Sequence, residues 1–237
     1  MGKIYAGTSG WAYSTWKQEF YPPDVGSAKF LSHYATRLNS VVVNYTFRSF
    51  LTKKLLKDWI EATPPGFKFA VKAHQSITHI KRLRNAARLT SKFLSSLQPL
   101  RVARKLGPVL FQLPPFLKCD LELLKEFMKE LPRQARCAIE FRHVSWFNDT
   151  VFTALQDANV ALCLAESDAL KTPIIRTADF SYLRLRREKY PPKSRRAVAK
   201  NANGFAKRGD VFVYFKHQEK PVGPLYAEEL LAAVKHR

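Results

Sequence analysis

The chain has 237 residues, and its 40 Lys and Arg residues against 19 Asp and Glu residues give a formal net charge of +21. Hydrophobic residues make up 46% of the chain and aromatic residues 13%, which is enough to bury a core and excludes a disordered basic tail. The odd number and wide spacing of Cys119, Cys137 and Cys163 fit neither a disulfide framework nor a CxxC metal clip. No apolar run has the length of a signal peptide or a membrane span, so we expect a cytoplasmic protein without a membrane partner.

Short apolar segments rich in β-forming residues recur along the chain, and most are followed by a longer segment of helical character. Strands are predicted at 3–8, 40–45, 67–72, 107–113, 136–141, 160–165, 181–185 and 210–215. Helices are predicted at 27–38, 52–62, 85–98, 120–130, 149–158, 194–207 and 224–235. The segment 166–180 is short and contains Pro173, so we expect an irregular segment there in place of a helix.

This alternation predicts a single α/β domain over residues 1–237, a (β/α)8 barrel of the TIM type. A doubly wound open sheet is the alternative fold. It usually carries a glycine-rich first turn, and the GTSGW segment at 7–11 is neither GxGxxG nor a P-loop. In a barrel, the carboxyl ends of all strands meet at one opening, here called the mouth, and binding residues are expected there.

The residues that follow the predicted strands are rich in cations, amides and aromatic rings and poor in carboxylates. The candidate binding residues are Trp11, Tyr13, Asn44, Gln112, Arg142, Arg184, Arg186 and Lys216. Arginine and lysine pair with phosphate, and aromatic rings stack on bases, so this composition suits an anionic ligand that also carries flat rings.

The net charge is concentrated in two segments. Residues 81–105 carry a net charge of +8 and residues 171–208 a net charge of +10. Their stretches 81–88 and 184–196 follow the third and seventh strands, so both are expected to start at the mouth and to form a cationic rim. The alternative is that these cations only solubilise helix exteriors.

Three residues are candidates for catalysis: Glu140, His143 and Lys72. Glu140 and His143 could act as base and acid or as metal ligands, and Glu140 could equally be a buried carboxylate that pairs with Arg142 or another cation. Lys72 could form a Schiff base or bind phosphate, or it could pair with Glu140 across the barrel.

Histidines and aromatic residues near the strand ends leave further alternatives open. A divalent metal ion is one of them, although the four candidate ligands lack a spacing such as HExxH: His74, His79, His143 and His217. Trp11, Tyr13 and Trp16 could form a stacking platform or could close the edge of the barrel by packing.

Several linked motifs resemble the YecE-like family, also called domain of unknown function 72. They are GTSGWAYSTW at 7–16, FYPP at 20–23, NYTF at 44–47, TPPGFKFAVK at 63–72, ITH at 77–79, LGPVLFQLPP at 106–115, EFRHVSW at 140–146 and DVFVYF at 210–215. The resemblance implies a TIM-type barrel, and members of the family have been likened to endonuclease IV, a barrel enzyme that acts on DNA phosphodiesters. It assigns the family's shared polar and aromatic positions to Trp11, Asn44, Lys72, His79, Gln112, Glu140, Arg142 and His143.

The sequence departs from this family's pattern at positions that alter the charge of the mouth. Val42 stands where the family usually has Glu, and Arg48 where it commonly has Tyr. The cations Arg186 and Lys216 occupy positions where the resemblance implies other polar residues. If the family's chemistry depends on the lost carboxylate, this chain would bind its ligand without the same catalysis.

The leading hypothesis is a barrel that binds nucleic acid or another phosphate polyanion at its mouth, with phosphodiester hydrolysis as its enzymatic form. In this hypothesis Glu140 and His143 exchange protons or hold a metal, and Lys72, Arg142 and Arg186 neutralise phosphate. One alternative is a non-catalytic barrel that binds nucleic acid or the acidic surface of a partner. Another is an enzyme that acts on a phosphorylated small molecule, because barrels often hold one phosphate after strands seven and eight.

Overall fold

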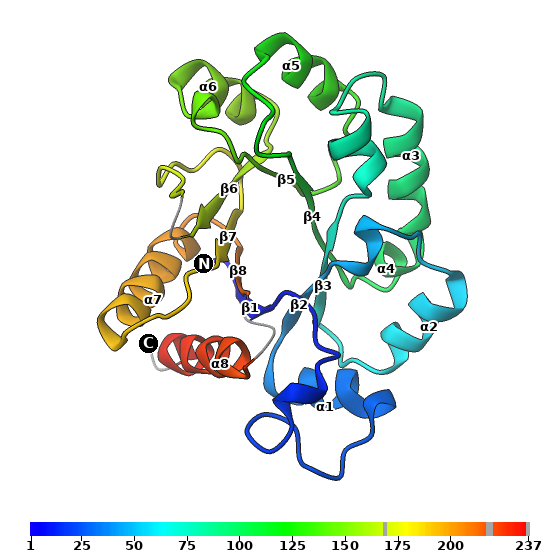
Figure 1. Ribbon diagram of the computed structural model, residues 1–237, viewed down its shortest axis with the longest axis vertical. Coiled ribbons are helices and arrows are strands. Elements are labelled where there is room, and N and C mark those ends of the chain that lie inside the picture. Colours follow the sequence, from blue (N-terminus) through cyan, green and yellow to red (C-terminus); the bar gives the residue numbers. More distant parts are fainter. Residues whose placement is uncertain (168–169, 217–219, 236–237) are drawn as a thin grey trace.

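Eight parallel strands run around a nearly closed barrel, and helices cover its outside (Figure 1). The computed structural model describes residues 1–167, 170–216 and 220–235, without the side chain of the last. The strands are β1 (Ile4–Thr8), β2 (Ser40–Val43), β3 (Lys68–Lys72), β4 (Leu106–Gln112), β5 (Cys137–Glu140), β6 (Ala161–Glu166), β7 (Ser181–Leu185) and β8 (Val211–Phe215). All eight predicted strands are present, with ends within two residues of the prediction, so the barrel is confirmed.

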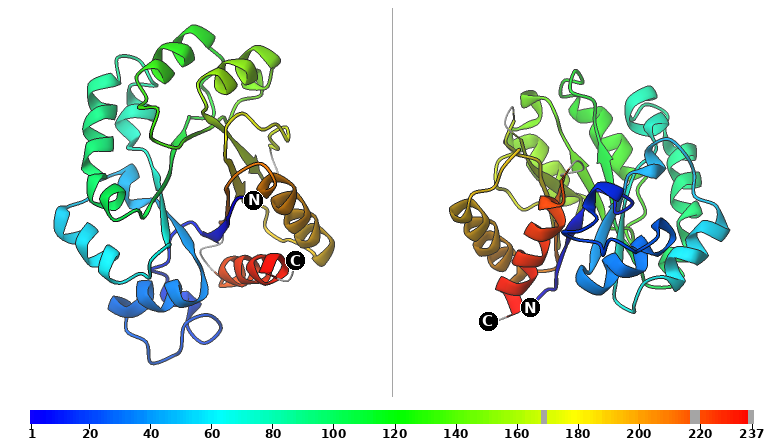
Figure 2. Two further views of the ribbon diagram at one scale, coloured as in Figure 1. Left: turned by 180° about the vertical axis from the view of Figure 1, so that it is seen from behind. Right: turned by 60° about the horizontal axis from the view of Figure 1, so that its bottom comes forward.

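The helices lie between the strands and pack their apolar faces on the barrel (Figures 1 and 2). They are α1 (Phe30–Arg37), α2 (Lys53–Glu61), α3 (Ala87–Ser96), α4 (Gln98–Val102), α5 (Leu121–Lys129), α6 (Asp149–Asp157), α7 (Pro192–Ala206) and α8 (Val222–Lys235). Three of them begin at a capping side chain that accepts a hydrogen bond from the first turn, namely Thr52, Asp120 and Asn148.

Two connections show how proline shapes the chain. The helix predicted at 85–98 ends at Ser96, and a separate helix, α4, begins at Gln98. Pro99 explains this break, because a proline inside a continuous helix has no N–H to donate and its ring clashes with the carbonyl four residues earlier, whereas the first turn of a helix tolerates it. After β6, residues 170–180 contain Pro173 and no helix, as predicted.

The seam between β1 and β2 closes the barrel differently from the other strand pairs. Seven parallel ladders join β2 through β8 to β1, whereas β1 and β2 share a single bridge between Ser9 and Val42. The Asn39 side chain substitutes for a ladder here, because its oxygen accepts a hydrogen bond from Ala6 N and its amide donates to Ile4 O.

Tyr34 from α1 adds the second link across the same seam. Its hydroxyl accepts a hydrogen bond from Thr8 N and donates one to Ser40 O, each at 2.9 Å. The two backbones approach so closely that a Cβ on Gly7 would lie 1.8 Å from Ser40 O, so only glycine fits there.

Large aromatic side chains from one side of the barrel fill its interior. Tyr5 and Phe212 stack with ring centroids 4.7 Å apart, and Tyr182 and Tyr214 lie 5.2 Å apart. They face smaller interior residues on the other strands, Val42, Ala70, Ala138, Ala161, Cys163 and Ala165. This packing fills the barrel below the mouth, so a ligand at the mouth would contact the side chains at the strand ends.

Candidate functional site: a cationic mouth

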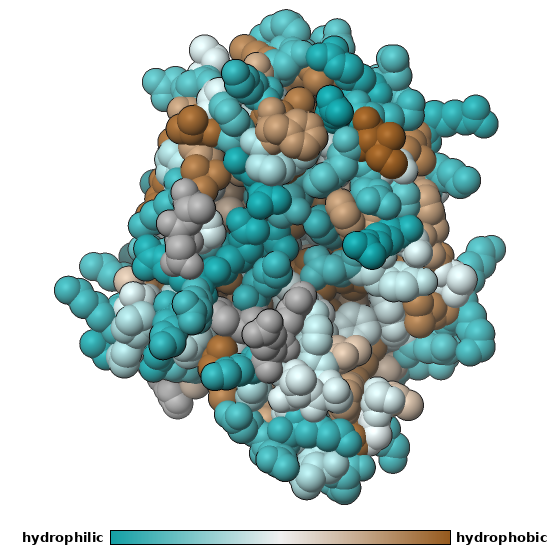
Figure 3. Space-filling view, in the orientation of Figure 1, coloured by the Kyte–Doolittle hydropathy of each residue, from teal (hydrophilic) through white to brown (hydrophobic). Residues whose placement is uncertain are grey.

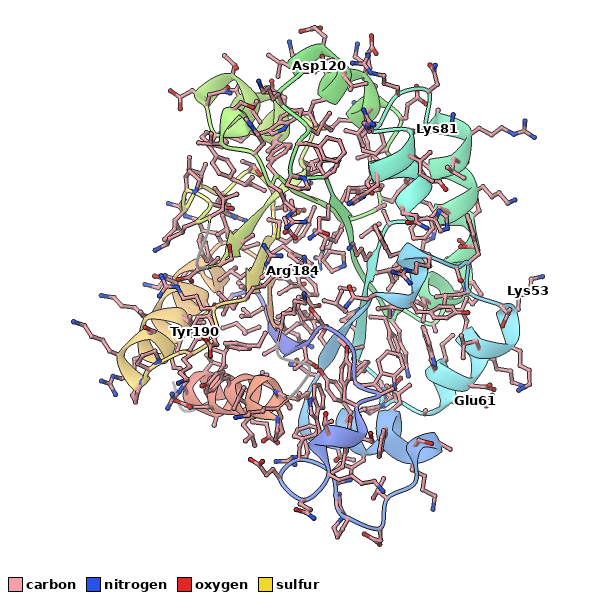
Figure 4. The ribbon with its side chains drawn as sticks, viewed as in Figure 1. Lys53, Glu61, Lys81, Asp120, Arg184 and Tyr190 are labelled. Atoms are coloured by element: carbon pink, nitrogen blue, oxygen red, sulfur yellow. The ribbon has the colours of Figure 1, made fainter. Side chains whose placement is uncertain are left out.

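Four polar side chains come together at the carboxyl end of the barrel. Lys72, Gln112, Glu140 and Arg184 stand on β3, β4, β5 and β7, and Arg184 lies in the middle of the barrel in Figure 4. The alternation of a strand explains their inward direction, because each follows an interior residue at a spacing of two: Ala70, Leu110, Ala138 and Tyr182. Sequence reasoning proposed all four, and the fold assembles them.

Glu140 is completely buried, and both of its oxygens already have partners. Arg184 Nη1 donates to Oε2 at 2.7 Å, and Gln112 Nε2 donates to Oε1 at 2.9 Å. Arg186 adds a second cation 3.6 Å from Oε1. Burial alone would raise the pKa of Glu140, but Arg184 and Arg186 outweigh it and hold the pKa below its ordinary value. Glu140 is therefore a buried anion that fixes the two arginines.

Lys72 stands apart from this ion pair. Its ammonium lies 3.8 Å from the centre of the Phe47 ring, an arrangement that holds the cation without a carboxylate. The pKa of Lys72 is lowered to about 8, and burial is the largest cause. The neighbouring Arg184 also lowers this pKa, by more than Glu140 raises it. The structure thus places Lys72 on an aromatic ring and leaves its ammonium facing other cations.

Three further cations surround the same opening: Arg142, Arg186 and Lys216. Burial lowers the pKa of Lys216, and Arg184 and Arg186 are the next causes. Burial likewise lowers the pKa of Arg186, against the opposing effect of Glu140. Like charges held this close disfavour each other, so an anion at the mouth would relieve their repulsion.

Two buried N–H groups in this cluster have no hydrogen-bond acceptor among the described residues. They are Nε of Arg184 and Nε of Arg186. The buried hydroxyl of Ser9, just after β1, is also unpartnered within the described part of the chain. Unsatisfied buried donors are rare in folded proteins and point to a ligand or water that accepts from them.

The histidines in the described part of the chain are engaged in caps and ring contacts. His143 accepts at Nδ1 from the backbone N–H of Ser145 and shares a 2.8 Å hydrogen bond with its hydroxyl, so it caps the turn Val144–Trp146. His74 packs on Phe50. Across residues 1–167, 170–216 and 220–235, no three His, Cys, Asp or Glu side chains are grouped to hold a metal ion. His217 lies outside the described residues, as does Asp168.

His79 is a histidine whose pKa is affected by the cations of the mouth. Its ring meets the Phe47 ring edge to face, with the ring centres 4.9 Å apart, and the ammonium of Lys72 lies over the same Phe47 ring. Burial, Lys72 and Arg142 together lower its pKa, which favours the neutral imidazole.

The aromatic residues after β1 are engaged in packing. Trp11 meets Trp59 edge to face at 5.0 Å, and Tyr13 lies 4.8 Å from the buried Trp16. The Tyr13 hydroxyl also donates to Ser9 O at 2.9 Å. These contacts match the packing alternative for this group.

Two remaining sequence candidates lie on or after β2. Asn44 is half-buried at the start of the turn Tyr45–Phe47. Val42 is fully buried among the interior side chains, so a carboxylate at its position would lie inside the barrel.

Sequence reasoning missed the apolar residues that the mouth loops expose. Tyr45, Ile80, Phe116, Val144 and Ile174 are all exposed, and each follows a different strand from β2 to β6. It also missed Phe47 as the ring beneath Lys72. A usable signal exists for most of the first group, because Ile80, Phe116, Val144 and Ile174 lie outside every predicted strand and helix, whereas Tyr45 was assigned to the end of the predicted strand 40–45.

The fold and its opening define a TIM-type barrel protein with a cationic mouth. The chain belongs to the family described as "Protein of unknown function DUF72", whose model matches residues 5–237. The resemblance drawn from the motifs is thereby confirmed. No helix within the described ranges has the length and apolar character needed to cross a membrane.

Two curated relatives carry family names without a biochemical activity. The UPF0759 protein YunF of Bacillus subtilis (strain 168) is 32% identical over 155 residues, which cover 61% of this chain and 52% of YunF. The UPF0759 protein YecE of Escherichia coli (strain K12) is 30% identical over 145 residues, which cover 61% of this chain and 50% of YecE. The chain thus spans about half the length of the curated relatives it matches.

Solved structures share the fold at low sequence identity. A DUF72 family protein from Thermotoga maritima MSB8 superposes with a TM-score of 0.86 at 22% identity, covering 98% of this chain and 99% of that one. An AP endonuclease, family 2, from Brucella melitensis gives a TM-score of 0.55 at 10% identity, covering 100% and 99%. These likenesses concern the barrel fold.

Proposed function

We propose that the mouth of this barrel binds phosphate groups of a nucleic acid. The observation that carries the proposal is an excess of cations over carboxylates: Lys72, Arg142, Arg184, Arg186 and Lys216 surround Glu140, the one fully buried acid among the described residues. The single negative charge of Glu140 is shared between Arg184 and Arg186, so it cannot balance all five cations. A phosphate oxygen would supply the missing negative charge.

The unpartnered donors support the same ligand. Arg184 and Arg186 each have a buried Nε–H without an acceptor in the described part of the chain. Guanidinium groups bind phosphate oxygens with two parallel hydrogen bonds, and here Glu140 holds one arginine in place so that less side-chain freedom is lost on binding. Lys72, on its aromatic ring, adds a positive charge without a competing carboxylate.

Phosphodiester hydrolysis has weaker support than binding. Glu140 is fully buried and its pKa is held below its ordinary value by Arg184 and Arg186, which makes it a weak base, and Nδ1 of His143 caps a turn. The proposal therefore concerns recognition of the phosphate, with Glu140 as the anchor of the arginines.

The test is a titration of the protein with labelled single-stranded and double-stranded DNA and RNA at two salt concentrations. Phosphate contacts make affinity fall steeply with salt, and Arg186→Gln is expected to weaken binding and to lower the salt slope by roughly 0.7 to 0.9. The control is Lys129→Gln, which removes an exposed cation at the end of α5 and is expected to leave affinity unchanged. Absence of binding to every nucleic acid at low salt would overturn the proposal.

A second candidate function is imine formation with a phosphorylated aldehyde or ketone, and Lys72 is the residue that favours it. With a pKa of about 8, a larger share of its side chain is the neutral amine at physiological pH than for an ordinary lysine. The amine would attack the carbonyl carbon, water would leave, and an imine would remain while the arginines hold the phosphate.

Reduction of the imine by cyanoborohydride makes this candidate testable. Incubation with glyceraldehyde 3-phosphate and cyanoborohydride should add the reduced adduct to Lys72 faster than to the exposed Lys129, as measured by peptide mass spectrometry. Inorganic phosphate should slow labelling of Lys72 alone. Equal labelling of the two lysines would reject this function.

A further inference from the structure

Exposed apolar side chains concentrate around the mouth. In the described part of the chain, Tyr45, Ile80, Phe116, Val144 and Ile174 are between 58% and 68% exposed. They lie in the loops after β2, β3, β4, β5 and β6, one in each loop. The other large exposed apolar residues, Met1 and Val102, precede β1 and β4 and thus lie toward the opposite end of the barrel. A single exposed apolar side chain is ordinary on a protein surface, but here five of the seven large ones in the described part of the chain gather at one end of the barrel.

Each of these loops also carries a cation that is exposed or half-buried. The cations are Arg48, Lys81, Lys118, Arg142 and Lys171, in the order of the loops. The loop residues 44–52, 73–86, 113–119 and 141–148 contain no acidic residue at all. We call these five apolar residues and five cations together the rim.

The apolar side chains of the rim are separated by polar surface. Figure 3 looks onto the barrel in the orientation of Figure 1 and shows isolated hydrophobic side chains around a largely hydrophilic centre. One of them, Phe116, lies beneath the guanidinium of Arg82, whose Cζ is 5.2 Å from the ring centre. The rim therefore offers separate rings and aliphatic groups with positive charge beside each, around the phosphate-binding cluster of Lys72, Arg184 and Arg186.

We infer that the rim binds the unpaired bases of a single-stranded nucleic acid, on aromatic platforms formed by Tyr45 and Phe116. This inference rests on the proposed function, since the mouth would hold the phosphates of the same strand. A single strand alternates anionic phosphates with flat apolar bases, and the rim alternates cations with exposed rings. A duplex hides the faces of its bases in the stack, so it would use only the cations.

A lipid surface fits the geometry less well than a single strand. The mouth cations are recessed, since Arg184 is only 3% exposed and the Arg186 side chain 17% exposed. A flat layer of headgroups would not reach them, whereas one phosphate of a flexible strand would.

The inference is tested with Tyr45→Ala, Phe116→Ala and the double variant in the full chain, using labelled oligothymidylate and a duplex of the same length. Loss of one stacked base is worth about 1–3 kcal/mol, so each substitution should weaken binding of the single strand roughly 5- to 150-fold. Duplex affinity and the salt slope should stay unchanged, because the phosphate contacts remain. Tyr45→Trp, which keeps a stacking ring, should retain the affinity.

The controls separate failure of the inference from failure of the proposed function. Val102→Ala removes a side chain that is 72% exposed but lies away from the mouth, and it should bind as the unmodified protein does. If Tyr45→Ala and Phe116→Ala bind oligothymidylate normally while Arg186→Gln does not, the base platforms are refuted and the phosphate site stands. If no variant and no unmodified protein binds, both fail. Binding to phosphatidylserine vesicles that requires Tyr45 and Phe116, without oligonucleotide binding, would assign the rim to lipid and overturn the inference.

Discussion

The residues of the mouth show what a strand-end position predicts and what it leaves open. Lys72, Gln112 and Glu140 could be placed there from the sequence because each is the last or the penultimate residue of a predicted strand, and each ends the observed one. Their partners could not, because the choice depends on the distance across the barrel. Glu140 pairs with Arg184, two strands away, and Lys72 lies on Phe47, so the alternative in which Lys72 pairs with Glu140 is not the arrangement found.

Replacement of Glu140 by glutamine should be strongly destabilising. Glu140→Gln leaves the buried Arg184 without a counter-charge, which costs about 3–5 kcal/mol of unfolding free energy near neutral pH. The depressed pKa of Glu140 stabilises the fold above the ordinary value of 4.5, so the difference between the two proteins should shrink as pH falls below it. Urea denaturation measures both effects. Glu122→Gln, at a surface pair, is the control, and an equal loss in the two variants would contradict the anchor role.

The buried position of Lys72 should lower the stability of the fold. Because its pKa falls from 10.5 to about 8 on folding, the folded state holds the charged form less readily than the unfolded chain. Lys72→Met should therefore raise the melting temperature below about pH 8, and this gain should shrink between pH 8 and 10.5 as the folded protein releases the proton first. Thermal denaturation across this range tests the prediction. A gain independent of pH would show that packing is responsible.

At the level of elements, the periodicity of apolar residues locates all eight strands, but it does not reveal how the barrel closes. The seam between β1 and β2 depends on Asn39 and Tyr34, two polar side chains that supply hydrogen bonds where a ladder is missing. Neither residue has a spacing that predicts this role. The break between α3 and α4 was predictable in principle from Pro99, since a proline inside a helix lacks the N–H that the helix needs and clashes with the preceding turn.

The seam makes the Tyr34 hydroxyl important for stability. Tyr34→Phe removes the acceptor of the Thr8 N–H and the donor to Ser40 O, both buried, and should cost about 1–3 kcal/mol. Tyr45→Phe removes an exposed hydroxyl and should change stability by less than about 0.5 kcal/mol. Chemical denaturation compares the two. Equal stabilities would mean that water replaces Tyr34 at the seam.

Across the whole molecule, the charge of +21 is divided between two environments. Part of it reaches the mouth and rim, as the sequence predicted for residues 81–88 and 184–196. Another part lies on the outer helices, where Arg195 of α7 pairs with Glu229 of α8. The sequence shows in which segments the positive charge is concentrated. The direction of each charged side chain, however, depends on the helix or loop to which it belongs. This is why the segment 184–196 contributes to both environments.

Two variants with equal net charge distinguish the two environments. In the first, four rim cations become glutamine: Arg48, Lys81, Lys118 and Lys171. In the second, four exposed cations of the outer helices and their ends become glutamine: Lys129, Arg133, Lys200 and Lys207. Each lost phosphate contact reduces the dependence of log affinity on log salt by roughly 0.7 for a single strand.

The first variant should therefore lower this slope by up to about 3, whereas the second should leave it nearly unchanged. A fluorescence titration of labelled oligothymidylate over a salt series measures both slopes. If long-range attraction by the net charge drove binding, the two variants would weaken it equally, since their charges are the same. Unequal slopes would instead locate the contacts at the rim, because only contacts with bound phosphates release counterions.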